Sequence, residues 1–324
     1  GRGNLGLAAL ADAAGLKEAP STYALGFVLG PRINAGGRIG DSALGAKLLT
    51  TAAREEAARI AVLLDRLNRE RKVMETAMLE AAIAKAEVEV DENPGLPIIV
   101  QGSRDWHKGL VGLVASRLTD RFGRPSLVLA IGDDGVATGS LRSISGVDIG
   151  AVVRRAAAYG LLLKGGGHAM AAGLAVEAAR LQELRGFLAA EVKDAVAARR
   201  AGAGLMIDGA LTPASVTPTL LADIERAGPF GQGNPTPRFV FPAHRLKAVR
   251  VMGDAHLRGT IEAGDGSRLG VVAFRCIGAP LGEAMLGAAN GLPVHIAGQL
   301  RRDTWGGREK TELLVDDVAD PRKQ

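Results

Sequence analysis

The stretch LPIIVQGSRDWHKGLVGLVASRLTDRFGRPSLVLAIGDDGVATGSLRS, residues 96–143, decides the fold. It alternates short apolar runs with one amphipathic segment, and the turn sequence Asp133-Asp134-Gly135 separates its last two runs. We expect a strand, a helix and two further strands at residues 96–101, 108–122, 126–131 and 136–143. This alternation predicts a mixed, mainly α/β sheet.

The same pattern continues to about residue 200. Asp148 opens a helix at 148–159, because a carboxylate suits the N-terminal end of a helix. Gly165-Gly166-Gly167-His168 reads as a flexible turn before a short strand at 173–176, and a long helix occupies 177–200. We therefore expect one α/β domain over residues 91–200.

The region after the linker Ala201-Gly202-Ala203-Gly204 is rich in β-structure. A strand at 205–207 and a helix at 218–227 come first. Short strands follow at 239–241, 245–252, 256–262, 267–274, 293–300 and 311–315, with one helix at 282–289. Five or six short strands with one interposed helix predict a small barrel of the OB type within residues 205–320.

A long uninterrupted helical pattern at 51–90 precedes the α/β domain. The roughly 36 residues of its helical pattern, which runs to about Val88, span about 54 Å at 1.5 Å per residue, and helices of this length usually connect two bodies. The alternative is the seam of a coiled-coil dimer. Residues 1–50 read as short helices around one unusual loop at 30–38.

Composition narrows the class of protein. The chain has 324 residues, enough for two domains, and 47% of them are hydrophobic, enough to form cores. Its net charge of +5 favours a polyanionic partner. Cys276 is the only cysteine, which excludes a disulfide framework and fits a reducing, cytoplasmic location. No apolar run reaches the length of a membrane span, and no signal-peptide pattern is present.

The expected strand at 136–143 carries a candidate phosphate clamp. Ser140 and Arg142 point to the same face of a strand, and Ser143 follows directly. A hydroxyl beside a guanidinium can hold a phosphate, which arginine binds through two hydrogen bonds. The alternative is an exposed strand with ordinary polar residues.

The glycine run before His168 is a second candidate. Gly166 and Gly167 allow the backbone to adopt positive φ and to approach a ligand closely, and exposed N–H groups in such a turn can bind an anion. His168 adds a donor or a proton-transfer group. The alternative is a flexible loop with a surface histidine.

Two further segments carry polar residues in suggestive places. Trp106-His107-Lys108-Gly109 lies between a strand end and a helix start, where α/β sheets bind ligands, although Trp106 also suits a core. The loop at 30–38 contains Arg32, Asn34 and Arg38, which can present donors to a phosphate. Its alternative role is to connect two helices.

A late segment, residues 301–310, reads as a hairpin with Trp305 near the Gly306-Gly307 turn. An exposed aromatic ring among basic residues suits base stacking along a single strand. The alternative is that Trp305 folds back to close the end of the barrel. The sequence has no P-loop, zinc motif, nucleophile elbow or Asp/His cluster with metal-ligand spacing, so it offers phosphate contacts without a catalytic centre.

Taken together, these segments resemble the RecJ exonucleases along essentially the whole chain. The resemblance rests on five motifs in the family's order and spacing, at residues 27–38, 106–118, 139–143, 166–174 and 229–239. Lys108 stands where the family usually has Glu, and Gly36 replaces an Ala. The change at Lys108 puts any role of that acidic position in doubt.

The resemblance implies a larger enzyme with a DHH domain that holds two Mn²⁺ or Mg²⁺ ions and hydrolyses phosphodiester bonds. Its metal motifs are expected upstream of Gly1, so this chain is expected to bind no metal and to be inactive alone. Residues 1–50 are expected to be the tail of the DHH domain and 51–90 the connecting helix. The DHH-associated domain would occupy 91–200 and an OB-containing region 205–320.

The resemblance also implies roles. Ser140 and Arg142 would hold the 5′-terminal phosphate, with Arg32 or Arg38 also on the backbone near the metals. His168 with Gly166 and Gly167 would close the nucleotide site, and the OB region would track the incoming strand. Asn34, His107, Ser143 and Trp305 are further expected substrate-binding residues. The implied activity is 5′-to-3′ cleavage of single-stranded DNA in repair and recombination, with a single-strand-binding protein and a helicase as partners and no membrane.

Three rivals share parts of this pattern. A DHH-family phosphodiesterase for oligonucleotides or cyclic dinucleotides has the Ser-x-Arg and Gly-Gly-His motifs but normally no OB region. A non-catalytic single-strand-binding or replication-scaffold relative belongs to another class, and the complete set of phosphate contacts argues against it. The related domain of alanyl-tRNA synthetases lacks the Pro-Phe-Gly loop at 229–231.

Overall fold

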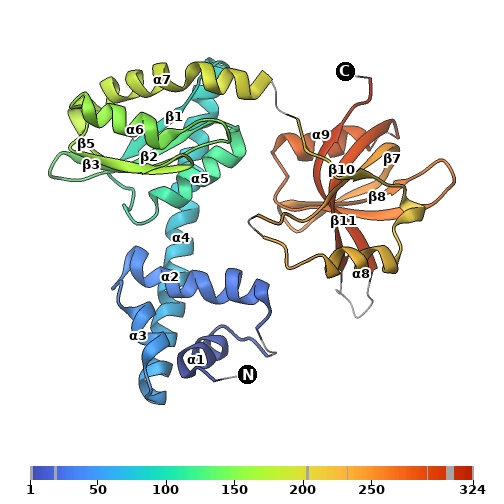
Figure 1. Ribbon diagram of the computed structural model, residues 1–324, viewed down its shortest axis with the longest axis horizontal. Helices are drawn as coiled ribbons and strands as arrows, with labels where there is room; N and C mark the ends of the chain where they lie inside the picture. The colour runs from blue at the N-terminus through green and yellow to red at the C-terminus, as the bar shows by residue number, and fades with distance from the viewer. Residues whose placement is uncertain are drawn as a thin grey trace. The chain divides into compact units, whose positions relative to one another are not determined.

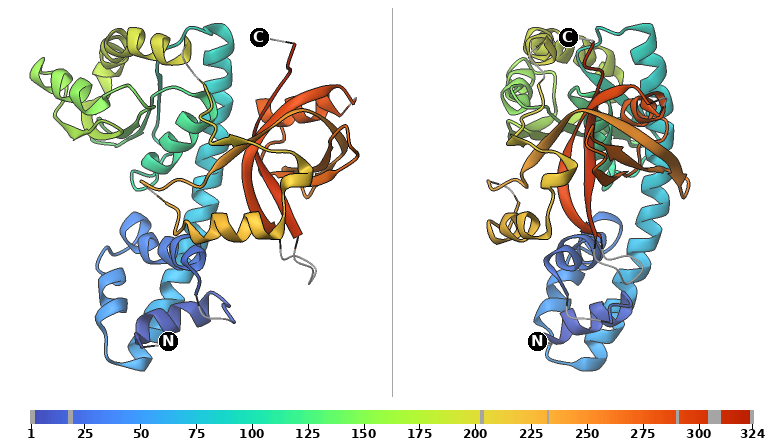
Figure 2. Two further views of the ribbon diagram at one scale, coloured as in Figure 1. Left: turned by 45° about the vertical axis from the view of Figure 1, so that its right-hand side comes forward. Right: turned by 90° about the vertical axis from the view of Figure 1, so that its right-hand side faces the viewer.

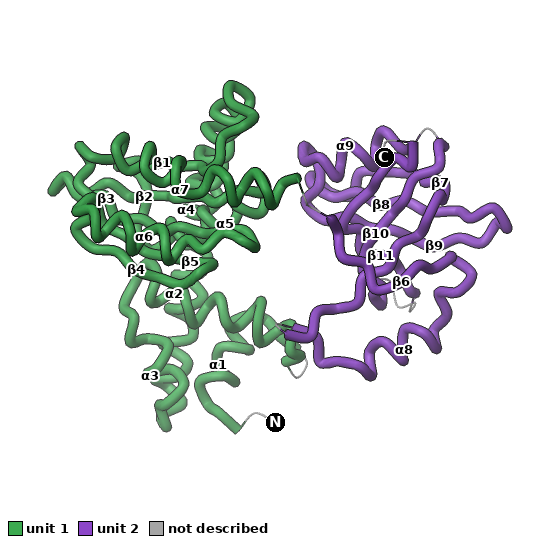
Figure 3. Tube along the Cα trace, turned by 45° about the horizontal axis from the view of Figure 1, so that its top comes forward, with its two compact units in different colours: residues 1–203 green, residues 204–324 purple. Residues whose placement is uncertain are grey.

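The computed structural model describes residues 3–17, 20–201, 204–231, 233–289, 291–303 and 310–322. It divides into two compact units, Gly1–Ala203 and Gly204–Gln324 (Figure 3). Each unit has its own hydrophobic core. Within the described residues, no helix is both long and apolar enough to cross a bilayer.

One long helix organises the first unit. Helix α4, Arg54–Glu92, runs for 39 residues without a break, as predicted. Helices α1 (Leu5–Ala13), α2 (Gly30–Ile39) and α3 (Leu44–Thr50) pack on its first half, and a π-helical turn, Ala24–Leu29, leads into α2 (Figures 1 and 2). The N-terminal part of α4 buries Ile60 and Leu64 in this helical core, whereas its C-terminal part buries Met78 and Ala82 in the core under the sheet. The helix therefore joins two bodies within one chain.

The expected loop at 30–38 is wrong, because these residues form helix α2. Pro31 is the second residue of α2, directly after the π-helical turn. Ala35 and Gly36 are buried, and a Cβ on Gly36 would lie only 2.8 Å from the carbonyl oxygen of Asp41. Close packing thus stabilises a helix whose glycine content argues against one.

A mixed five-stranded sheet forms the second body of this unit, with the strand order β1-β2-β3-β5-β4. Its strands are β1 (Ile99–Ser103), β2 (Ser126–Ile131), β3 (Val136–Arg142), β4 (Lys164–His168) and β5 (Ala171–Glu177). β1 and β2 are parallel, and the other neighbouring pairs are antiparallel. The predicted mixed sheet is confirmed.

Helices cover the two faces of this sheet unequally. Helix α5 (Val111–Phe122) packs on β2 and β3 from one side (Figure 1). On the other side, α6 (Ile149–Ala158) packs on β4 and β5, and α7 (Leu181–Ala201) packs on α6 after a 3₁₀ turn at Ala178–Arg180. Asp148 caps α6 as expected, because its Oδ1 accepts a hydrogen bond from the N–H of Ala151 at 2.9 Å.

The expected flexible turn at Gly165-Gly166-Gly167-His168 is also wrong, because these residues are strand β4 at the edge of the sheet. None of the three glycines has positive φ. A Cβ on Gly167 would collide with Ala172, and a Cβ on Gly165 would lie 2.7 Å from the side chain of Leu162. The glycines therefore serve close packing, and the turn itself falls at residues 169–170.

The second unit is a closed five-stranded barrel, which confirms the OB prediction. Strands β7, β8 and β9 form a meander, β9 pairs with β11 in parallel, and β10 pairs with both β11 and β7. The barrel strands are β7 (Arg238–Met252), β8 (His256–Glu262), β9 (Arg268–Ala273), β10 (Pro293–Asp303) and β11 (Lys310–Ala319). Helix α9 (Pro280–Ala288) lies between β9 and β10 in the chain, while β6 (Gly209–Ala210), a 3₁₀ turn (Pro213–Ser215) and helix α8 (Pro218–Arg226) precede β7.

Two details of this unit differ from expectation. The strand expected at 205–207 is absent, and pairing starts only at β6, after the carboxylate of Asp208 accepts a hydrogen bond from the backbone N–H of Arg238 at 2.8 Å. The strands expected at 239–241 and 245–252 form the single strand β7. Ala243 and Ala248 have positive φ within it, so the strand bends without ending.

Candidate anion-binding site

Four of the candidate residues share one face of the sheet. In the register of the strands, Ser140 lies opposite Gly173, which lies opposite Gly166. One row along, Arg142 lies opposite Ala171, which lies opposite His168. Paired residues project from the same face, as do residues two apart in one strand. Ser140, Arg142, Gly166 and His168 therefore project to the side of the sheet that α5 covers.

This face is bare over β4 and β5, because α5 packs on β2 and β3. Gly166, Gly173 and His168 are exposed, and a Cβ on Gly166 would have no neighbour within 4 Å. We call Gly166, Ala171 and Gly173 the glycine floor. A flat floor without bulky side chains allows a ligand to approach the backbone closely.

Ser140 and Arg142 form a preorganised pair beside this floor. The guanidinium Nη1 of Arg142 donates hydrogen bonds to Ser140 Oγ at 2.6 Å and to the carbonyl of Leu141 at 3.1 Å. Helix α5 begins above them, and a Cβ on Gly112 would lie 2.9 Å from Arg142 Nη2. Burial lowers the pKa of Arg142 from its usual value, and the positive charge of Arg38 lowers it further.

Arg38 reaches the same place from helix α2. Its Nη1 donates to the carbonyl of Gly109 at 3.3 Å, and a Cβ on Gly109 would collide with the carbonyl oxygen of Arg38. His107 fixes this loop, because its Nδ1 accepts a hydrogen bond from the N–H of Gly109 at 3.1 Å. Helix α2 and the loop before α5 are thus interlocked, which holds Arg38 near Arg142.

Neither Arg38 nor Arg142 forms an ion pair with a carboxylate among the described residues. Two neighbouring guanidinium groups repel each other, and this repulsion adds to burial, the larger cause, in lowering the pKa of Arg142. An anion between them would remove the repulsion and accept charge-assisted hydrogen bonds. The arrangement is therefore suited to bind a phosphate group.

The other sequence candidates occupy different places. Arg32 Nε forms an ion pair with Asp65 at 2.8 Å, which links α2 to α4. The Nη1 of Arg32 donates a hydrogen bond to the carbonyl of Val28. Ser143 is buried, and its Oγ donates to the carbonyl of Val147 at 2.6 Å. Asn34 lies one helical turn before Arg38, on the same side of α2.

Trp106 packs in the core formed by α4, α5 and the sheet, and Lys85 lies 5.3 Å from its ring centroid. Trp305 lies outside the described residues. The sequence reasoning missed Gly109 and Gly112, whose role is to leave room for neighbouring atoms, and Gly173, which forms part of the exposed glycine floor. One sequence signal could have revealed Gly109 and Gly112: both are glycines at the start of a helix that begins next to a candidate site.

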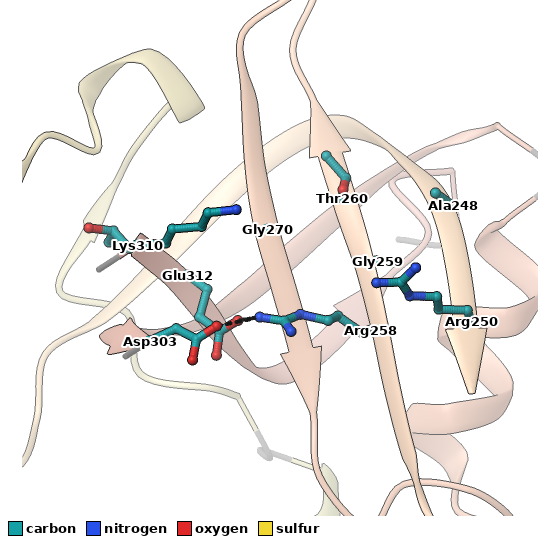
Figure 4. A pocket seen from close by; sticks show the side chains of 10 residues that line it. Ala248, Arg250, Arg258, Gly259, Thr260, Gly270, Asp303, Lys310 and Glu312 are labelled. Atoms are coloured by element: carbon teal, nitrogen blue, oxygen red, sulfur yellow. Dashed lines mark hydrogen bonds and ion pairs between the residues drawn. The ribbon is translucent and has the colours of Figure 1, made fainter. Parts of the chain in front are cut away.

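The barrel contains a second charged site, a cavity of about 520 Å³ (Figure 4). It is lined by Ala248, Arg250, Arg258, Gly259, Thr260, Gly270, Asp303, Lys310, Thr311 and Glu312. Arg258 Nη2 binds Asp303 and Glu312, each at 2.6 Å, and these hydrogen bonds raise the pKa of Arg258. Arg250 and Lys310 form no ion pair among the described residues. The cavity therefore presents two cations to a ligand.

Among the described residues, no three His, Cys, Asp or Glu side chains come together in a way that could hold a metal ion.

Comparisons with known proteins match both units. A family model for the DHHA1 domain matches residues 95–194, and one for the RecJ OB domain matches residues 207–317. The single-stranded-DNA-specific exonuclease RecJ of Escherichia coli (strain K12) is 36% identical over 305 residues, covering 91% of this chain and 51% of that protein. The protein of the same name from Bacillus subtilis (strain 168) is 33% identical over 301 residues, covering 91% of this chain and 36% of that protein.

Solved structures with a similar fold also match. The crystal structure of RecJ in complex with Mn²⁺ from Thermus thermophilus matches with a TM-score of 0.75 and 27% identity, covering 98% of this chain and 44% of that one. The corresponding complex with Mg²⁺ matches with a TM-score of 0.74. This chain spans about half the length of the E. coli relative.

Proposed function

Because the chain is a RecJ exonuclease homologue with a DHHA1 domain and a RecJ OB domain, we propose that it binds the single-stranded DNA substrate of a 5′-to-3′ exonuclease. The pair of Arg38 and Arg142, which has no carboxylate partner among the described residues, is the observation that carries this proposal. Both guanidinium groups are held in place before any ligand binds.

The 5′-terminal phosphate is proposed to lie between these arginines, with Ser140 Oγ as a further donor. The terminal nucleotide would then lie along the glycine floor, where no bulky side chain obstructs it. His168 and His107 border this position from β4 and from the loop before α5, and Asn34 lies one turn from Arg38 on α2. Arg32 and Ser143 would support the site through the contacts that they make within the protein.

The barrel is proposed to bind the strand further from its end. Arg250 and Lys310 would contact phosphates, because Arg258 is already neutralised by two carboxylates. An OB barrel combines such cations with sequence-tolerant contacts to bases. The match to the RecJ OB domain supports this assignment over a phosphodiesterase for short oligonucleotides or cyclic dinucleotides.

Hydrolysis itself is proposed to need Mn²⁺ or Mg²⁺ bound outside the described residues. The matching Thermus structures are complexes with these ions. A pair of such ions activates water and stabilises the attacking and leaving oxygens. We propose that this chain alone binds DNA without cleaving it. Residues 1–50 would be the tail of a DHH domain, 51–90 the connecting helix, 91–200 the DHH-associated domain and 205–320 the OB region.

In the cell, the proposed role is DNA repair and recombination in the cytoplasm. A helicase would supply the single strand, and a single-strand-binding protein would present it. The name of these relatives, single-stranded-DNA-specific exonuclease, supports the DNA substrate.

Fluorescence anisotropy with a labelled 5′-phosphorylated single strand, at several salt concentrations, tests the proposal. The wild-type chain should bind, and its affinity should fall with salt. Arg142→Ala should weaken binding about 10- to 100-fold, as expected for the loss of charge-assisted hydrogen bonds. Arg59→Ala removes an exposed arginine on α4 and should leave the affinity unchanged. Absence of binding by the wild type at low salt would overturn the proposal.

A further inference from the structure

Phe274 is an exposed aromatic ring on the barrel, directly after β9. It is 42% exposed, although aromatic residues make up only 3% of the chain. The guanidinium of Arg301, from β10, lies 4.9 Å from the ring centroid. The ring of His256, from β8, meets it edge-on at 5.2 Å. Phe274 is therefore held in one orientation at the surface by residues from two other strands.

The backbone beside this ring is unusual. Arg275 has a φ of +52°, which is uncommon for a residue with a side chain. Its N–H donates to His256 Nδ1 at 2.7 Å, so the same histidine orients both the ring and the strained residue. The next residue, Cys276, is anchored by the carbonyl of Ala255. Strained backbone of this kind persists where the surrounding structure holds it, often at ligand sites.

A continuous row of contacts connects Phe274 to the charged cavity. Arg301, which covers the ring, also binds Glu312 through Nη2 at 2.6 Å. Glu312 is nearly fully buried and also binds Arg258, which in turn binds Asp303 in the cavity wall (Figure 4). The charges of Arg301 and Arg258 are thus balanced by carboxylates. We infer that these two residues position neighbouring side chains and do not bind phosphate.

Arg275, the cation next to the ring in the chain, differs from Arg301 and Arg258. The side chain of Arg275 is exposed and forms no ion pair within the part of the chain that the structure describes. The site thus combines a fixed aromatic ring, an available cation beside it and a cavity with Arg250 and Lys310 further along the barrel. Aromatic rings interleaved with cations are typical of surfaces that bind single-stranded nucleic acid.

We propose that Phe274 is a stacking platform for one base of the single strand, and that Arg275 contacts the adjacent phosphate. This rests on the proposed function, since it presumes that a single strand crosses the barrel. Stacking suits this role because every base has a π-face, so a ring binds any sequence. The guanidinium over the ring and the edge-on histidine hold the ring in one orientation before binding. Less conformational entropy is therefore lost when a base stacks on it.

The test uses the full chain and a single strand with 2-aminopurine at successive positions. Stacking on Phe274 should change the fluorescence of the probe at one position and leave the others less affected. Phe274→Leu keeps an apolar side chain without a ring and should weaken binding about 5- to 100-fold, with loss of the position-specific signal. Phe274→Trp should retain both the affinity and the signal.

Two controls separate stacking from a structural role. Tyr159→Leu removes another exposed ring, from the first unit, and should change neither the affinity nor the signal. Arg275→Ala should reduce the slope of log K against log salt by about 0.7, the loss of one phosphate contact, while the 2-aminopurine signal stays. Thermal melting of each variant identifies any that is not folded.

The outcomes are distinguishable. If the wild type binds the strand but Phe274→Leu, folded, binds it equally well with an unchanged signal, the stacking platform is overturned and the proposed function stands. If Phe274→Trp loses the signal that the wild type gives, stacking is likewise contradicted. If the wild type does not bind any single strand, the proposed function itself is overturned.

Discussion

Arg38 and Arg142 come from a helix and from a strand of separate bodies, yet the charge of Arg38, after burial, lowers the pKa of Arg142. The two cations are brought together by the contact of α2 with the loop before α5. Proteins normally place a carboxylate near such a pair, and none pairs with either arginine among the described residues. The arrangement costs stability without a ligand and favours binding of an anion.

We expect Arg142→Gln to leave the free energy of unfolding unchanged or to raise it slightly. The reason is that burial and the repulsion from Arg38 both disfavour the charged form of Arg142 in the folded state. Urea unfolding of the two proteins measures the difference. A loss of several kcal/mol would show that the arginine mainly stabilises the fold.

Gly109→Ala is expected to lower the free energy of unfolding by about 1–3 kcal/mol, because the added methyl group collides with the carbonyl of Arg38 and backbone must shift. DNA affinity should fall as well, since Arg38 is displaced. Gly186→Ala is the matched control: it lies within α7 with open space around it, and should stabilise the chain by up to about 1 kcal/mol.

Gly166→Val should separate binding from stability. A Cβ at this position meets no neighbour within 4 Å and valine suits a strand, so the melting temperature should not fall. The same side chain would stand on the glycine floor and should weaken binding of a 5′-phosphorylated strand at least about tenfold. Unchanged affinity of this variant would place the strand elsewhere.

The two arginines of the barrel cavity should respond differently to removal. Arg258→Ala leaves the buried carboxylate of Glu312 with Arg301 as its remaining partner, and should cost about 1–3 kcal/mol of stability. Arg250→Ala should leave stability unchanged but reduce the salt dependence of DNA binding by one phosphate contact, a slope change of about 0.7. Urea unfolding and salt titrations distinguish the two. Equal effects of both variants in both assays would contradict this division of roles.

Much of the fold could be predicted from the sequence. Helix α4, the mixed sheet and the barrel were expected because apolar periodicity is strong in each. Strand β4 and helix α2 were missed for a common reason. Glycine is read as a sign of flexibility, but Gly167 and Gly36 lie where a side chain would collide with a neighbouring segment. That collision depends on how the chain folds back at Asp41 and at Ala171 and Ala172, which the glycine residues themselves do not reveal.

The candidate site could be predicted only in part. Ser140 and Arg142 were expected on one face because they are two apart in a strand, and their hydrogen bond agrees with that pattern. The approach of Arg38 depends on the contact between α2 and Gly109, which no spacing in the sequence reveals. The same limit applies to Arg32, whose partner Asp65 lies on another helix.

The most direct test of the central claim compares strands that differ only at the 5′ end. Affinities for a 5′-phosphorylated and a 5′-hydroxyl single strand are measured for the wild type and for Arg142→Ala. The wild type should prefer the phosphorylated strand about tenfold or more, as expected for a charge-assisted pair, and Arg142→Ala should lose this preference. Equal affinity of the wild type for both strands, or a preference that survives in Arg142→Ala, would contradict a terminal-phosphate site at Arg38 and Arg142.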